Sequence, residues 1–121
     1  MNQPLTFLID KLNKQLHELD LNLHAAQCTK QELEQQIQNI EEQIDQTQTN
    51  SRLVNPASEI NWLNFIIQQQ EKKESITLDL KNYRDVENKL KEKINRIKME
   101  LSMLTNYLHR QSTNEQKSSL V

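Results

Sequence analysis

Glycine is absent from all 121 residues of this chain, and apolar side chains recur every three or four positions along most of it. Glycine is the residue that most readily adopts positive φ, so its absence disfavours tight hairpin turns and Gly-rich phosphate-binding loops. A three-four spacing places apolar side chains along one stripe of a helix. The sequence therefore predicts an all-α protein built from coiled-coil helices.

The first expected helix, residues 4–48, carries a row of apolar residues that alternates steps of four and three, as in a coiled coil. Pro4 suits its first turn. The only charged member of the row is Lys30, which could keep its ammonium group in water or form a polar layer that fixes the helix register. The a and d positions are Leu5, Ile9, Leu12, Leu16, Leu19, Leu23, Ala26, Lys30, Leu33, Ile37, Ile40 and Ile44.

A polar segment separates this row from a second one. We expect a loop over 49–55, Asn55 as N-cap, and a second helix over 56–111 that begins at Pro56. Residues 112–121 lose the pattern and are expected to fray. The second row consists of Ile76, Leu80, Tyr83, Glu87, Leu90, Ile94, Ile97, Leu101, Leu104 and Leu108.

The start of the second helix is less regular. The same frame extended backward reaches Trp62, Ile66, Gln69 and Lys73, and two of these four residues are polar. Beside this frame, Ile60, Leu63 and Ile67 form a second line of aliphatic residues, called here the apolar stripe. Two lines of this kind could reflect a shift of register.

Two long rows and a short connection favour one domain, residues 1–121, folded as an antiparallel coiled-coil hairpin of two long helices. Such a hairpin would place Leu5–Ile9 opposite about Ile97–Leu101, and Ile40 near Ile66. A dimer of longer rods is the competing arrangement, and a hairpin could itself form a homodimer.

Composition limits the function classes. Only 35% of residues are hydrophobic and 4% aromatic, the net charge is −2, and basic residues are not interleaved with aromatic ones, which disfavours nucleic acid as a partner. No apolar run approaches the roughly 20 residues that span a bilayer, and no signal-peptide pattern is present. The single cysteine, Cys28, fits a reducing compartment. We therefore expect a cytoplasmic protein that does not insert into membranes.

Enzyme chemistry has little support in the sequence. His17 and His24 are seven residues apart, so they lack the i,i+4 spacing with which two imidazoles hold one metal ion. Cys28 has no basic neighbour beyond Lys30 that would activate a thiol. We expect no catalytic residue, metal ion or cofactor.

Two features suggest protein partners. From Lys81 to Arg110 there are eight basic and four acidic residues, and Lys89, Lys91, Lys93 and Arg96 could attract an acidic surface, unless they are simply a solvated face. The cluster around Trp62, Leu63 and Phe65 cannot all face one helix interface. It indicates a docking surface, a locally thicker core or a dimer contact.

The segment Ala57-Ser58-Glu59-Ile60-Asn61-Trp62-Leu63-Asn64-Phe65 resembles the FliJ/YscO family, the two-helix coiled-coil stalk proteins of flagellar and type III secretion export machines. The resemblance implies a stalk whose paired helix ends enter a hexameric export ATPase ring, and whose body contacts the export gate and export chaperones. It also implies a peripheral position at the inner membrane through those partners.

Carried over to this chain, the basic residues would face the ATPase, and residues near Trp62 and Phe65 would contribute to the gate-facing surface. The tyrosines that flagellar members carry late in their first helix are replaced here by Gln43, Asp45, Gln46 and Gln48. The alternative function is a general coiled-coil scaffold or chaperone subunit that mediates protein assembly.

Overall fold

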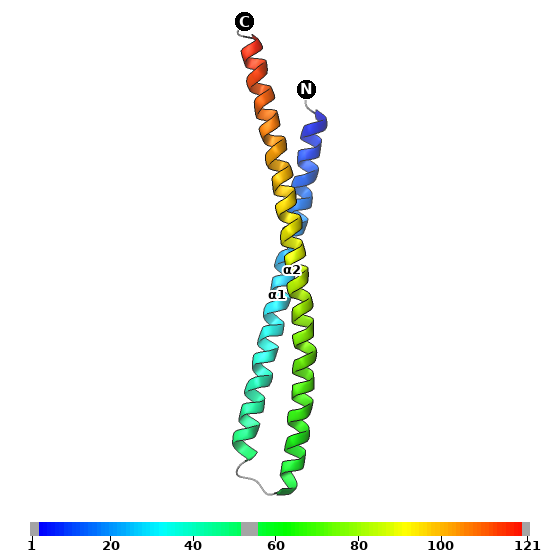
Figure 1. Cartoon of the computed structure of the whole chain (residues 1–121), viewed down its shortest axis with the longest axis vertical. Coiled ribbons are helices and arrows are strands. Elements are labelled where there is room, and N and C mark those ends of the chain that lie inside the picture. Colours follow the sequence, from blue (N-terminus) through cyan, green and yellow to red (C-terminus); the bar gives the residue numbers. More distant parts are fainter. Residues whose placement is uncertain (1–2, 52–55, 120–121) are drawn as a thin grey trace. The chain divides into compact units, whose positions relative to one another are not determined.

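The computed structural model describes residues 3–51 and 56–119, and the side chains of 3–49 and 60–114. The described residues form two helices, α1 (Gln3–Ser51) and α2 (Pro56–Ser119), and contain no strand (Figure 1). The two helices pack against each other, which confirms the predicted all-α helical hairpin.

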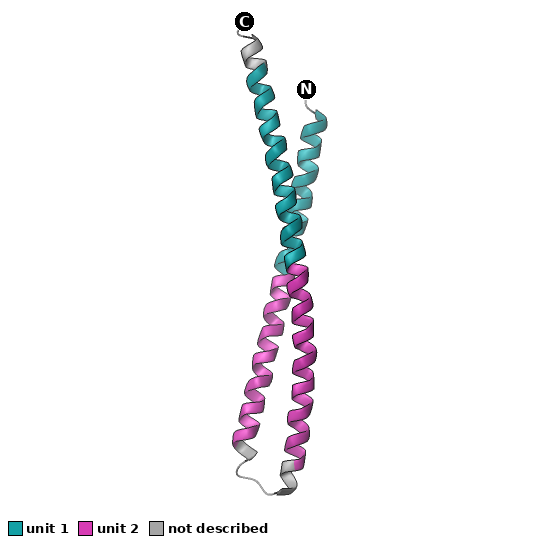
Figure 2. Cartoon of the chain, viewed as in Figure 1, with its two compact units in different colours: residues 1–25, 88–121 teal, residues 26–87 magenta. Residues whose placement is uncertain are grey.

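The chain divides into two compact units, and each combines one stretch of each helix (Figure 2). Unit 1 comprises Met1–Ala25 and Asn88–Val121, and unit 2 comprises Ala26–Glu87. Within unit 2, Lys30 of α1 pairs with Glu87 of α2. Glu41, which comes later in α1, pairs with Lys73, which comes earlier in α2. The helix pair in this unit is therefore antiparallel.

Both helices extend beyond their expected ends. α1 continues to Ser51, and its Thr49 hydroxyl donates to the Asp45 carbonyl oxygen at 2.9 Å, a bond that lets a threonine remain inside a helix. α2 begins at Pro56, as predicted, and runs to Ser119 rather than 111. Residues 112–119 contain neither glycine nor proline, so losing the apolar pattern does not itself stop the helix. Asn55 and residues 52–55 of the expected loop lie outside the described residues.

The predicted apolar rows form the helix interface. All twelve a and d positions of the first row are buried or partly buried, with Ile40 at 4% exposure the most buried among them. In the second row Ile76, Leu80 and Ile94 are buried. Tyr83 is the exception, because it is 36% exposed. A two-helix interface leaves its side chains open on both flanks, so a phenol can keep its hydroxyl in water.

The register of the hairpin differs from the expected one. In unit 2, Ile40 lines a hollow together with Ile76, ten residues beyond the expected Ile66. In unit 1, Ile97 lies across from Leu19 rather than from Leu5–Ile9. Residues equally distant from the connection are therefore not opposite each other. The expected pairing placed opposite each other the residues at equal distances from the middle of the connection, and the observed contacts are offset from that pairing.

Candidate functional site

The residues predicted to bind partners fall in two units. Trp62, Leu63 and Phe65 belong to the part of α2 in unit 2, whereas Lys89, Lys91, Lys93 and Arg96 belong to the part of α2 in unit 1.

Trp62 contributes to the packing of α2 against α1. Its indole Nε1 donates a hydrogen bond to the backbone carbonyl oxygen of Thr47 at 2.8 Å, and the side chain is partly buried. Phe65 is also partly buried, and the adjacent Ile66 is only 7% exposed. Most of this aromatic cluster thickens the helix interface at this position, with the indole N–H bonded across the two helices.

The apolar stripe lies outside that interface. Ile60, Leu63 and Ile67 are 65%, 49% and 51% exposed. The neighbouring frame that contains Trp62 and Ile66 keeps the buried positions, so the apolar stripe is a separate face of α2 and not the product of a register shift. From the helical repeat, its centre lies about a third of a turn from the buried frame. Among Trp62, Leu63 and Phe65, only Leu63 is exposed.

The four basic residues predicted to bind a partner are all exposed. The 3.6-residue repeat places Lys89, Lys93 and Arg96 on one side of α2, and these three are called here the basic stripe. Lys91 projects from a different side of the helix.

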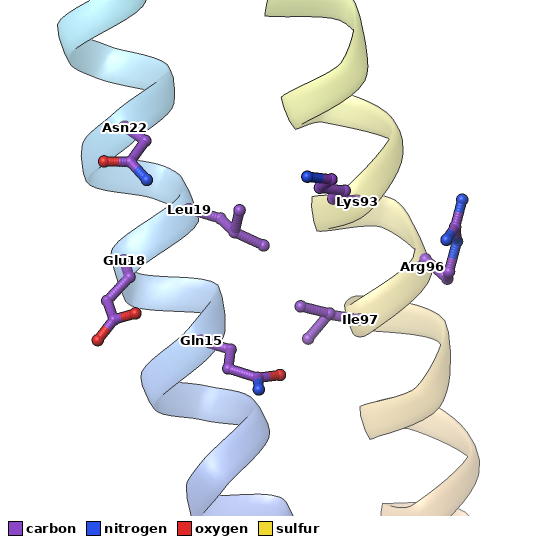
Figure 3. Close-up of a pocket in the computed structure, with 7 residues that line it drawn as sticks. All are labelled: Gln15, Glu18, Leu19, Asn22, Lys93, Arg96 and Ile97. Carbon is purple, nitrogen blue, oxygen red and sulfur yellow. The ribbon is translucent and has the colours of Figure 1, made fainter.

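Lys93 and Arg96 also border a hollow of about 320 Å³ between the helices of unit 1 (Figure 3). In this view Leu19 and Ile97 point toward one another from the two helices, and the Arg96 guanidinium points away from α1. The remaining lining residues are Gln15, Glu18 and Asn22 of α1. The hollow is lined by aliphatic, amide and charged groups.

A polar layer that sequence reasoning only half identified crosses the interface of unit 2. The Lys30 ammonium lies 2.9 Å from Glu87 Oε2, and Gln27 Nε2 donates to Glu87 Oε1 at 3.4 Å. Glu87 is 7% exposed. The arrangement supports the register-setting role of Lys30, because a buried carboxylate requires a nearby cation. The sequence contains a signal for this layer, because each apolar row includes one charged residue, Lys30 in the first and Glu87 in the second, and their charges are opposite.

Other polar groups of the interface are less well satisfied. Gln69 Oε1 is buried and has no hydrogen-bond partner among the described residues.

Two ion pairs lie at the solvated edges of the same helix pair. Lys73 Nζ lies 2.9 Å from Glu41 Oε1, and Arg84 Nη2 lies 3.9 Å from Glu34 Oε1. Exposed ion pairs of this type contribute little to stability.

The described residues do not group three or more His, Cys, Asp or Glu side chains in a way that could hold a metal ion. Cys28 is exposed. Within residues 3–51 and 56–119, neither helix has a stretch apolar enough to cross a bilayer.

Comparison of the chain with protein-family models, curated proteins and solved structures gives no match.

Proposed function

We propose that this chain is a non-enzymatic stalk or adaptor of a flagellar or type III protein export machine. In this role it links a hexameric export ATPase to the export gate and to export chaperones. The observation that carries the proposal is the exposed basic stripe on unit 1, the unit that combines the first stretch of α1 with the last stretch of α2. In the family that residues 57–65 resemble, paired helix ends of this kind enter the ATPase ring.

Electrostatics supports this use of the basic stripe. Lys89, Lys93 and Arg96 are spaced by four and three residues, so they share one side of α2, where Glu92 and Glu100, each four residues from Arg96, offset part of their charge. Exposed charges of one sign accelerate association with a surface of the opposite sign, and they orient the encounter. The proposed partner surface is therefore acidic. Localisation follows from the same proposal: a cytoplasmic protein held peripherally at the inner membrane by its protein partners.

A general coiled-coil scaffold or chaperone subunit is the second candidate. The exposed apolar stripe favours it, because aliphatic side chains on a solvated helix can bind an apolar partner without any basic stripe. The two candidates differ in which surface the partner contacts, so substitutions can distinguish them.

The decisive experiment combines a pull-down with an ATP-turnover assay on the hexameric export ATPase of the same organism. We expect the wild-type chain to bind the ATPase and to change its turnover. Reversing Lys89, Lys91, Lys93 and Arg96 to Glu should abolish both effects while circular dichroism retains the helical signal. Absence of binding by the wild-type chain, or full binding by the reversed chain, would refute the stalk proposal.

A matched pair controls for net charge. Lys93→Glu with Arg96→Glu changes the charge by the same amount as Lys72→Glu with Lys81→Glu, and all four side chains are exposed. The first pair lies in unit 1 and the second in unit 2. We expect the first pair to weaken ATPase binding and the second to leave it unchanged. Equal losses from both pairs would mean that only overall charge matters.

A further inference from the structure

The apolar stripe lies in the longest run of α2 that contains no charged residue. Residues 60–70 include no charged side chain, although charged residues make up 26% of the chain. The exposed neighbours of the stripe, Asn64 and Gln70, are amides, which both donate and accept hydrogen bonds. Depletion of charge around exposed aliphatic residues is typical of the centre of a protein interface.

A two-fold symmetric interface places the same surface on both sides, so any charge near its centre would meet a like charge. The uncharged face avoids this repulsion, and its amides can pair with the same amides of another copy. An acidic or basic partner would gain no complementary charge on residues 60–70. The surface chemistry therefore favours a second copy of this chain over a charged partner.

Leu63 lies close to the middle of the apolar stripe. Leu63 is three residues from Ile60 and four from Ile67, so an antiparallel copy sets Ile60 against Ile67 and brings the two Leu63 side chains together beside the two-fold axis. We propose that this chain forms an antiparallel homodimer through Ile60, Leu63 and Ile67 of α2.

The acidic residues that follow the stripe select the antiparallel arrangement. Glu71 and Glu74 are exposed and are the first charged residues after Ile67 along this side of α2. A parallel dimer would set them beside their own copies, whereas the antiparallel dimer separates the two sets to opposite ends of the interface. The dimer is independent of the ATPase contact proposed above, which uses the basic stripe of unit 1.

Sedimentation equilibrium from low micromolar to near-millimolar protein tests the association. We expect a reversible dimer, and Leu63→Glu should weaken it by roughly tenfold or more, because it places two carboxylates beside the axis. Leu78→Glu is the matched control: Leu78 is 61% exposed on the same helix and lies outside the proposed interface. A wild-type chain that stays monomeric throughout, or a dimer unaffected by Leu63→Glu, would overturn the proposal, even if a foreign protein binds the apolar stripe.

Disulfide trapping tests the geometry in a Cys28→Ser background. Leu63→Cys should form an intermolecular disulfide under mild oxidation, because the two side chains meet beside the axis. Leu78→Cys should not, since the helical rise places the two copies of that position about 40 Å apart in the antiparallel dimer. Efficient trapping at residue 78 instead of residue 63 would contradict the antiparallel arrangement.

Discussion

The polar layer of unit 2 gives the sharpest test of how this hairpin is held together. Replacing Lys30 by Leu leaves the carboxylate of Glu87, whose side chain is 9% exposed, without the ammonium group 2.9 Å away. Only the longer bond from Gln27, at 3.4 Å, would remain of the two contacts described above. Breaking a buried ion pair from one side typically costs about 3–5 kcal/mol.

The expected cost here is lower than that range. The side chain of Lys30 is 25% exposed and that of Glu87 is 9% exposed, so water already screens part of the interaction. We expect Lys30→Leu to lower the free energy of unfolding by about 2–3 kcal/mol, equivalent to a fall in Tm of roughly 10 °C for a chain of this length. Lys81→Leu, at an exposed position of the same unit, should change it by less than about 0.5 kcal/mol.

The double variant Lys30→Leu/Glu87→Leu separates stability from register. Replacing both charges by apolar groups removes the desolvation cost, so the double variant should recover to within about 1 kcal/mol of the wild-type chain or exceed it. Urea unfolding followed by circular dichroism measures all three variants. A single substitution that costs less than about 0.5 kcal/mol, or a double variant as unstable as the single one, would refute the view that Glu87 depends on Lys30.

Three further predictions concern the same helix pair. Gln69→Leu should raise the free energy of unfolding by about 1 kcal/mol, because it removes a buried oxygen that lacks a partner. Thermal unfolding measures the change, and no gain in stability would contradict the prediction. Trp62→Phe should cost about 1 kcal/mol by deleting the bond to the Thr47 carbonyl, measured in urea, and a neutral result would mean that this bond contributes nothing. A double-mutant cycle on Glu41 and Lys73 should give a coupling below about 1 kcal/mol that shrinks with added salt, whereas a larger, salt-insensitive coupling would contradict their exposure.

The fold was predictable because the apolar repeat carries most of the information needed for a two-helix interface. Every a and d position assigned to the first helix is removed at least partly from solvent. The start of α2 at Pro56 also follows from a local signal, since proline is well tolerated in the first turn. Local patterns of this kind depend only on residues close in sequence.

The register was not predictable from the repeat alone. A row of a and d residues can pack against its partner in several alignments, because shifts by the three- and four-residue steps of the repeat, alone or combined, keep apolar residues in the interface. The repeat therefore does not decide whether Ile40 meets Ile66 or Ile76, which are ten residues apart. The charged residues Lys30 and Glu87 break this degeneracy, because only one alignment brings them together. Aligning Lys30 with Glu87 would have supplied the register that the apolar residues do not determine.

The candidate site was predictable in part for a similar reason. Periodicity identifies Lys89, Lys93 and Arg96 as one side of a helix, and their exposure follows from their polarity. It did not indicate that the indole of Trp62 would bond to a backbone carbonyl of α1, because that contact depends on the register. The separation of Trp62 from the exposed Leu63 became clear only with the helix pair in place.

Intramolecular distances test the antiparallel hairpin most directly. Spin labels at Glu34 and Arg84 probe unit 2, and labels at Glu18 and Arg96 probe unit 1, each in a Cys28→Ser chain diluted with unlabelled protein. Packed helix axes lie about 8–10 Å apart, so both label pairs should report separations of roughly 10–25 Å that persist on dilution. Separations beyond about 40 Å, or short distances that vanish on dilution, would show that the two helices pair between molecules and would contradict the hairpin.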